Sequence, residues 1–175
     1  MTDAMQAGDE LIYEERLSSK WTQVLFVVLT APFLLYVLWR LITIGADAPS
    51  VVVFCLFAFF LFYSINYRML VIRLTRVSLK LAFGIFRWTV PLENIGDCQL
   101  DDELPLLLRF GGAGIHFMWV HGRYRVSFNF LEYPRVVIRL KKRTWLVVRD
   151  VSFSTRRPTE LVQLIRGLTA AMGAE

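Results

Sequence analysis

Two long apolar runs without charged residues dominate the first part of the chain. The run from Trp21 to Trp39 reads WTQVLFVVLTAPFLLYVLW, and the run from Val51 to Ile65 reads VVVFCLFAFFLFYSI. A helix needs about 20 apolar residues to cross the hydrocarbon core of a membrane. We therefore predict two transmembrane helices, at about 21–43 and 50–67. The short link GADAPS contains Gly and Pro, and it predicts that the two helices form an antiparallel hairpin.

Two other interpretations of these runs are weaker. Buried core helices of soluble proteins rarely lack charges over such a length. A cleaved signal peptide has a basic start and a shorter apolar core, whereas residues 1–20 are polar and acidic. We therefore expect a polar cytoplasmic segment at 1–20, disordered over residues 1–10, and an anchor that is retained in the mature protein.

After Arg68 the hydrophobic period changes to two, which is typical of strands with one packed face and one wet face. Three segments alternate about a central turn and predict β-hairpins, at 77–90, 115–130 and 135–151. We expect six or seven antiparallel strands in all.

The expected turns and wet faces follow from the same pattern. The turns are predicted at Gly84, at His121-Gly122 and at Lys141 to Thr144. Arg125 and Ser127 alternate with the apolar positions of their strand and are therefore expected to face water.

The chain ends in a predicted amphipathic helix, at 158–172. Pro158 suits the first helical position, Glu160 suits the positive end of the helix dipole, and Gly173 suits the stop. The apolar positions recur with helical spacing at Leu161, Leu164, Ile165, Leu168 and Met172. This stripe predicts a helix that caps the strands of a single core, formed by residues 68–175.

The order of these elements resembles the bacterial pleckstrin-homology-like (PH-like) domain family of small membrane proteins. Four segments carry the resemblance: the strand opening Leu74–Leu79, the turn Gly84–Phe86, the segment Val90–Ile95, which is similar to an "I-P-L-x-x-I" signature, and the helix start Arg157–Leu161. The resemblance implies a two-helix membrane anchor followed by a bent antiparallel sheet or barrel with a C-terminal helical cap. The stretch 110–135 has no counterpart in that pattern.

The charge is divided unevenly along the chain, whose mean hydropathy is +0.47. Residues 1–66 contain three Lys or Arg against six Asp or Glu, and residues 67–175 contain seventeen against nine. Cytoplasmic flanks of membrane helices carry the excess of Lys and Arg. We therefore expect a multi-pass protein of the inner (plasma) membrane with both termini in the cytoplasm. Trp21, Trp39, Tyr67 and Arg68 are the expected anchors at the membrane interfaces.

The most informative candidate site is basic. Arg139, Lys141, Lys142 and Arg143 are expected to form a surface at a hairpin tip that contacts anionic lipid or another acidic partner. The alternative is that positive-inside bias alone explains these charges. A nucleic-acid partner is disfavoured, because the aromatic residues alternate as core positions instead of forming a stacking surface.

Other candidate sites are weaker. The stretch Phe110–Gly114 lacks the Lys-Ser/Thr of a P-loop, and His116 and His121 point to opposite faces of a strand. Asp101, Asp102 and Glu103 are expected in a solvated loop, with ion pairs to the basic strands as the alternative. Cys55 and Cys98 have no reason to pair, which fits a reducing compartment. We expect no catalytic residue, metal or cofactor.

These observations predict a non-catalytic protein that binds or scaffolds at the inner face of the membrane. Its expected partners are membrane lipids and a protein, or a second copy bound through the helix hairpin. The alternative is an accessory subunit, in which the aromatic-rich second helix packs against a larger membrane transport or assembly complex.

Overall fold

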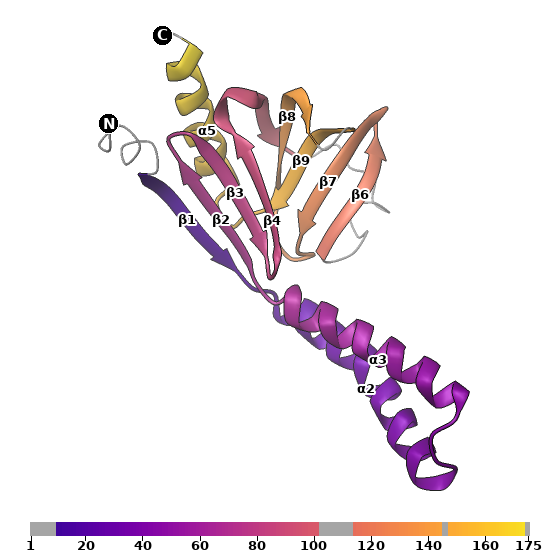
Figure 1. Cartoon of the computed structure of the whole chain (residues 1–175). Helices are drawn as coiled ribbons and strands as arrows, with labels where there is room; N and C mark the ends of the chain where they lie inside the picture. Colours follow the sequence, from indigo (N-terminus) through magenta and orange to yellow (C-terminus); the bar gives the residue numbers. More distant parts are fainter. Residues whose placement is uncertain (1–9, 102–113, 145–146, 174–175) are drawn as a thin grey trace, which may run out of the picture.

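The computed structural model describes residues 10–101, 114–144 and 147–173. In chain order its elements are β1 (Leu11–Leu17), α2 (Lys20–Thr43), α3 (Ala48–Asn66), β2 (Leu70–Thr75), β3 (Ser78–Phe83), β4 (Phe86–Pro91), η1 (Leu92–Asn94), β5 (Ile95–Leu100), β6 (Gly114–Val120), β7 (Arg123–Asn129), β8 (Arg135–Thr144), β9 (Val148–Ser154) and α5 (Pro158–Gly173). The protein is α+β, and two apolar helices extend from one end of a two-sheet domain (Figure 1). We call this the hairpin end, and the opposite end the far end.

The helices α2 and α3 agree with the two predicted apolar helices within a few residues. Both are long and apolar enough to cross a membrane. In the most apolar window of each helix only 11% and 6% of the residues are buried, which distinguishes them from core helices. The Ser19 side chain accepts a hydrogen bond from the amide of Thr22, and the Asp47 side chain accepts one from the amide of Ser50, so each helix begins at a polar N-cap.

The first sheet has the strand order β1-β2-β3-β4, with all neighbours antiparallel. Its first strand precedes the helices in sequence, and its second strand follows them. Residues 11–17, which lie within the predicted polar segment at 1–20, therefore form an edge strand of the domain. Tyr13, Glu15 and Leu17 point inward from β1 and are buried.

The second sheet has the order β5-β8-β9-β7-β6. The predicted hairpin at 115–130 is confirmed as β6 and β7, and the turn lies at His121-Gly122. β8 runs on through Thr144, so Lys141 to Arg143 lie in the strand and not in the turn. Residues 145–146 of that predicted hairpin lie outside the described residues.

The strand count and the strand directions differ from expectation. The described residues after Arg68 contain eight strands instead of six or seven, with β1 ahead of the helices as a ninth, and β7 pairs with β9 in parallel. The connection explains the parallel pair: β8 runs back toward the far end, and its hairpin returns β9 between β8 and β7 (Figure 1). The expectation of an all-antiparallel set was therefore wrong for this pair.

One hydrophobic core lies between the two sheets. Phe83 of the first sheet contacts Phe130 edge-on at 5.0 Å, and Trp88 contacts Phe128 at 6.4 Å. The C-terminal helix is confirmed at Pro158–Gly173, and it packs on β5, η1 and β8 through Leu161 and Ile165, which are fully buried.

Candidate functional site

The predicted basic surface lies at the far end of the domain. β8 begins at Arg135 near the helix hairpin and ends at Thr144. A strand rises about 3.3 Å per residue, so Lys142 lies roughly 23 Å beyond Arg135 along β8. At that height Lys142 exchanges two backbone hydrogen bonds with the side chain of Asn94 in η1, at 2.7 and 3.2 Å. We call Arg139, Lys141, Lys142 and Arg143 the patch. Around Lys142 the patch is separated from the helices by most of the length of the sheet (Figure 1).

The four residues of the patch do not form one uniform surface. All four side chains are exposed. Arg139, however, is paired in the sheet with Asp97 on one side and Asp150 on the other. Lys141 and Lys142 instead line a shallow groove of about 250 Å³ with Glu93 and Asn94. Arg139 therefore has two carboxylate residues as register partners, whereas Lys141 and Lys142 share their groove with one, Glu93.

Part of the polar face of the second sheet, around Arg125 and Ser127, is buried, which corrects the expectation that these two residues face water. Arg125 is only 5% exposed and donates to Asp101 at 2.8 Å. Ser127 and Ser152, both fully buried, share a hydrogen bond of 2.6 Å. These polar groups pair across neighbouring strands, and a buried polar side chain destabilises the fold little once it is hydrogen-bonded. The favoured expectation, a solvated loop, is therefore wrong for Asp101, whose side chain is 1% exposed, and the alternative of pairing with a basic strand is the one observed.

A second ion pair removes a further charge from the basic surface. Arg123 donates to Asp150 at 2.7 Å, and Asp150 is 2% exposed. The hydrogen bond to Asp150 raises the pKa of Arg123, so this guanidinium remains charged. Arg123 and Arg125 hold the sheet together, and they offer little charge to a partner.

The start of α2 is fastened to the loop between β7 and β8. The Glu132 carboxylate accepts hydrogen bonds from the Ser19 hydroxyl at 2.9 Å and from the Trp21 amide at 3.1 Å. The hydroxyl of the neighbouring Tyr133 donates to the Ser18 carbonyl at 3.0 Å. A carboxylate at a helix N-terminus also interacts favourably with the helix dipole. The second sheet thus holds the first turn of α2 directly.

The end of α3 is fastened to the turn between β3 and β4. The Asn66 side chain accepts a hydrogen bond from the Ile85 amide at 3.2 Å and donates to the Phe62 carbonyl at 2.9 Å. Gly84, with φ +56°, lies so close to Asn66 that an added Cβ would be 2.7 Å from the Asn66 carbonyl oxygen. We call the contacts of Glu132 and of Asn66 together the joint. The start of α2 is fixed to the second sheet, and the end of α3 is fixed to the first sheet. The joint therefore sets the position of the helix pair relative to both sheets.

The expected interface anchors separate into two groups. Trp21 and Trp39, near opposite ends of α2, are 72% and 55% exposed, and Arg68 is exposed just after α3. Tyr67 is only 5% exposed, and its ring contacts Phe83 edge-on at 5.2 Å. Tyr67 was therefore wrongly expected to face a membrane interface. It packs inside the joint because the chain turns into β2 directly after it.

A buried carboxylate that sequence reasoning missed ties β1 to the start of α5. Glu15 is 7% exposed and accepts hydrogen bonds from Tyr13 at 2.8 Å, from Thr155 at 2.5 Å and from the Arg156 amide at 3.0 Å. The period-two alternation of Tyr13, Glu15 and Leu17 was the available signal. It was obscured because a glutamate occupies an inward position.

The weaker candidates do not assemble into a catalytic or metal site within the described ranges. His121 occupies the turn at the far end with φ 49°, while His116 lies in the middle of β6. Across residues 10–101, 114–144 and 147–173, no three His, Cys, Asp or Glu side chains come together as metal ligands. The stretch 110–113 lies outside the described residues. Both thiols are free: Cys55 is exposed on α3, and Cys98 is buried.

Comparison of the chain with protein-family models, with curated proteins and with solved structures found no match.

Proposed function

We propose that this protein is a membrane-anchored adaptor that binds a partner without catalysis. In this proposal α2 and α3 cross the inner membrane as a hairpin, and both termini lie in the cytoplasm. The sheets and α5 form a PH-like domain that presents a binding surface.

One observation carries the proposal: exposed apolar helices are joined firmly to a well-packed polar domain. Ile42 is 84% exposed and Trp21 is 72% exposed. Exposure of such large apolar side chains is unfavourable in water, whereas contact with lipid is favourable. The hydrogen bonds of Glu132 and Asn66 fasten both helices to the sheets. Such a joint would hold the domain at a fixed distance from the bilayer.

The height of the basic patch favours a protein partner over lipid. Lys141, Lys142 and Arg143 lie roughly 20 Å or more from the hairpin end, by the rise of β8. That is beyond the Debye length of about 8 Å over which a charged bilayer acts at physiological ionic strength. A patch held there would meet an acidic surface on a cytoplasmic protein, and the anchor would raise its effective concentration near the membrane.

Photocrosslinking from position 142 in intact membranes tests this function. We expect a photoreactive residue at Lys142 to capture one acidic cytoplasmic protein, with a yield that falls as salt rises. The variant K141E/K142E/R143E should lower the yield at least tenfold at a crosslinker placed on Thr144. Capture of lipid alone would contradict the proposal, and so would release of the wild-type chain from membranes by alkaline carbonate.

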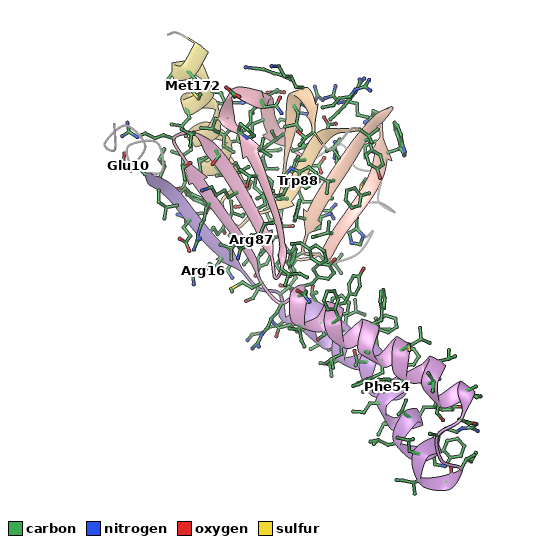
Figure 2. All side chains as sticks on the ribbon, viewed as in Figure 1. Glu10, Arg16, Phe54, Arg87, Trp88 and Met172 are labelled. Carbon is green, nitrogen blue, oxygen red and sulfur yellow. The ribbon has the colours of Figure 1, made fainter. Side chains whose placement is uncertain are left out.

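A second function is favoured by the exposed aromatic side chains of α3. Phe54 and Phe59 are 54% and 53% exposed on α3, and Figure 2 shows Phe54 on the helix pair. An accessory subunit of a transport or assembly complex would cover them with another membrane helix. A photoreactive residue at Phe54 should then capture one integral membrane protein in stoichiometric yield, whereas an adaptor should yield lipid from this position.

A further inference from the structure

The outer face of the first sheet carries two cross-strand rows of side chains. The row nearer the helices consists of Arg16, Val71, Ala82 and Arg87, which are register partners across all four strands. The next row toward the far end consists of Glu14, Arg73, Lys80 and Thr89. Every second residue of a strand points to the same face, so both rows face outward together.

The two rows enclose a hollow with an apolar floor and a basic rim. Val71 and Ala82 are short and lie at the centre of the first row, between Arg16 and Arg87 at its ends. A groove of about 440 Å³ opens over this floor, lined by Arg73, Lys80 and Arg87 among others, with Gly84 at its hairpin end. Figure 2 shows Arg16 and Arg87 on this half of the domain, near the helices.

The charge of the two rows is strongly unbalanced. Four cationic side chains face one carboxylate, that of Glu14. Arg16 and Arg73 both reach that carboxylate, at 2.8 and 3.4 Å. Arg87 lies at the other end of its row, on the β4 side of the groove and across the sheet from Glu14. An anion fits there by charge complementarity.

The groove also lies close to the point where the helices leave the domain. Gly84 ends the groove, and Ile85 next to it donates its amide to Asn66 in the last turn of α3. Arg87 is three residues from Gly84, or roughly 10 Å along the strand. The headgroup layer of a bilayer is about 5–7 Å thick on each side, and an arginine side chain spans a similar length.

We propose that this groove binds the phosphate headgroup of an anionic phospholipid in the same leaflet that receives the helices. The inference rests on the membrane anchoring proposed above. Arg87 and Arg73 hold the phosphate, and the floor of Val71 and Ala82 accepts the glycerol carbons. This surface, and not the patch at Lys141 to Arg143, is the lipid contact of the protein.

Lipid retention by the full chain tests the groove. The protein is extracted in a mild detergent with an equal mixture of phosphatidylglycerol and phosphatidylcholine, and the lipids it keeps are counted by native mass spectrometry. We expect the wild type to prefer phosphatidylglycerol about tenfold, and R16Q/R73Q/R87Q to abolish that preference. The matched control K141Q/K142Q/R143Q removes the same charge at the far end and should retain it.

A milder variant keeps the test informative if the triple variant misfolds. R87Q alone, which breaks no ion pair given above, should reduce the preference about threefold. Equal retention of phosphatidylglycerol by the wild type, R87Q and the triple variant would overturn the proposal. So would a result in which soluble glycerol phosphate protects a T89C thiol from alkylation but phosphatidylglycerol does not, because the groove would then be a site for a soluble phosphate.

A separate measurement distinguishes failure of the proposed membrane anchor from failure of the groove. Extraction of the same membranes with alkaline carbonate reports anchoring without reference to lipid type. Release of the wild-type chain would contradict the membrane anchor itself. Retention of all variants in the membrane, together with loss of lipid preference only in the groove variants, is the result that supports the groove.

Discussion

At the scale of single residues, the buried carboxylate of Glu15 is expected to contribute strongly to stability. Its three hydrogen-bond donors come from β1 and from the segment that leads into α5. Glu15→Ala would leave these donors unsatisfied in the interior. We expect the free energy of unfolding to fall by about 3 kcal/mol, measured by denaturant titration of the full chain in micelles.

Glu14 provides the matched control for that substitution. It lies one residue away on the same strand, but it faces outward toward Arg16 and Arg73. The hydrogen bond from Arg16 lowers the pKa of Glu14, yet the pair is open to solvent and screened. Glu14→Ala should therefore cost far less than Glu15→Ala. Equal losses would contradict the inward orientation of Glu15.

The Cys98 thiol should be inert in the folded protein. Burial raises the pKa of Cys98 to about 12, so the reactive thiolate is absent at neutral pH. In a C55S background, iodoacetamide at pH 8 should label the unfolded chain within minutes and leave the native chain unmodified. Rapid native labelling would show that β5 opens readily.

The same thiol gives stability a pH dependence with a definite sign. Its pKa is about 12 in the folded chain and about 9 in the unfolded chain, so between these values only the unfolded chain loses the proton. Stability should consequently fall as pH rises from about 9 to 12. C98A should make the decline less steep, as measured by thermal unfolding over that range.

At the scale of elements, the turn between β3 and β4 depends on the absence of a side chain at Gly84. Its φ of +56° disfavours an L residue, and a Cβ would lie 2.7 Å from the carbonyl oxygen of Asn66. We expect Gly84→Ala to reduce the free energy of unfolding by about 3 kcal/mol.

Gly122 separates the two contributions to that loss. It also has a positive φ, of +74°, but nothing lies within 4 Å of its added Cβ. Gly122→Ala should therefore cost only the conformational part, about 1 kcal/mol. Similar losses at the two positions would mean that the contact of Gly84 with Asn66 contributes nothing to the joint.

The elements that the sequence predicted best are those with a strong period or a long uniform run. The two apolar helices, the hairpin at 115–130 and the C-terminal helix needed only local pattern. β1 was missed because Glu15 places a charged residue at an inward position of the strand. Hydrogen bonds from the distant Thr155 and Arg156 stabilise this buried carboxylate. Long-range partners of this kind leave no local trace in a sequence.

The sequence predicted the exposure of the basic side chains but not their position in the fold. Four exposed basic side chains were identified correctly as exposed. The distance of these side chains from the helices depends on the direction of β8. A period-two pattern is the same for a strand running in either direction, so it does not predict that distance. Arg125 was expected at the surface because alternation reports which face a residue shares, and it cannot report whether that face is covered.

At the scale of the whole molecule, the joint predicts two different depths for two basic surfaces. Fluorophores are attached at R87C and at K142C in a C55S background, and the full chain is placed in vesicles with a quencher on the lipid headgroups. We expect strong quenching at position 87, beside the helices, and none at position 142, because the sheet separates them by roughly 20 Å.

Position 89 gives an internal calibration, since Thr89 is exposed two residues farther along β4. Its quenching should be weaker than that at position 87 but still measurable. Equal quenching at positions 87 and 142 would mean that the domain lies on its side against the bilayer. In that arrangement the contacts of Glu132 and Asn66 would have to break, which faster hydrogen exchange at the Trp21 and Ile85 amides would reveal.

The position of β1 ahead of the helices has a consequence for biosynthesis. A ribosome releases β1 first, yet its pairing partner β2 is made only after both helices. If α2 and α3 cross the membrane as proposed, the first sheet can close only when the start of α2 and the end of α3 lie on the same side of the bilayer. A chain with one helix misinserted would leave β1 and β2 on opposite sides of the bilayer, with unpaired edges open to proteases. Under this proposal, pairing of β1 with β2 depends on the correct insertion of both helices.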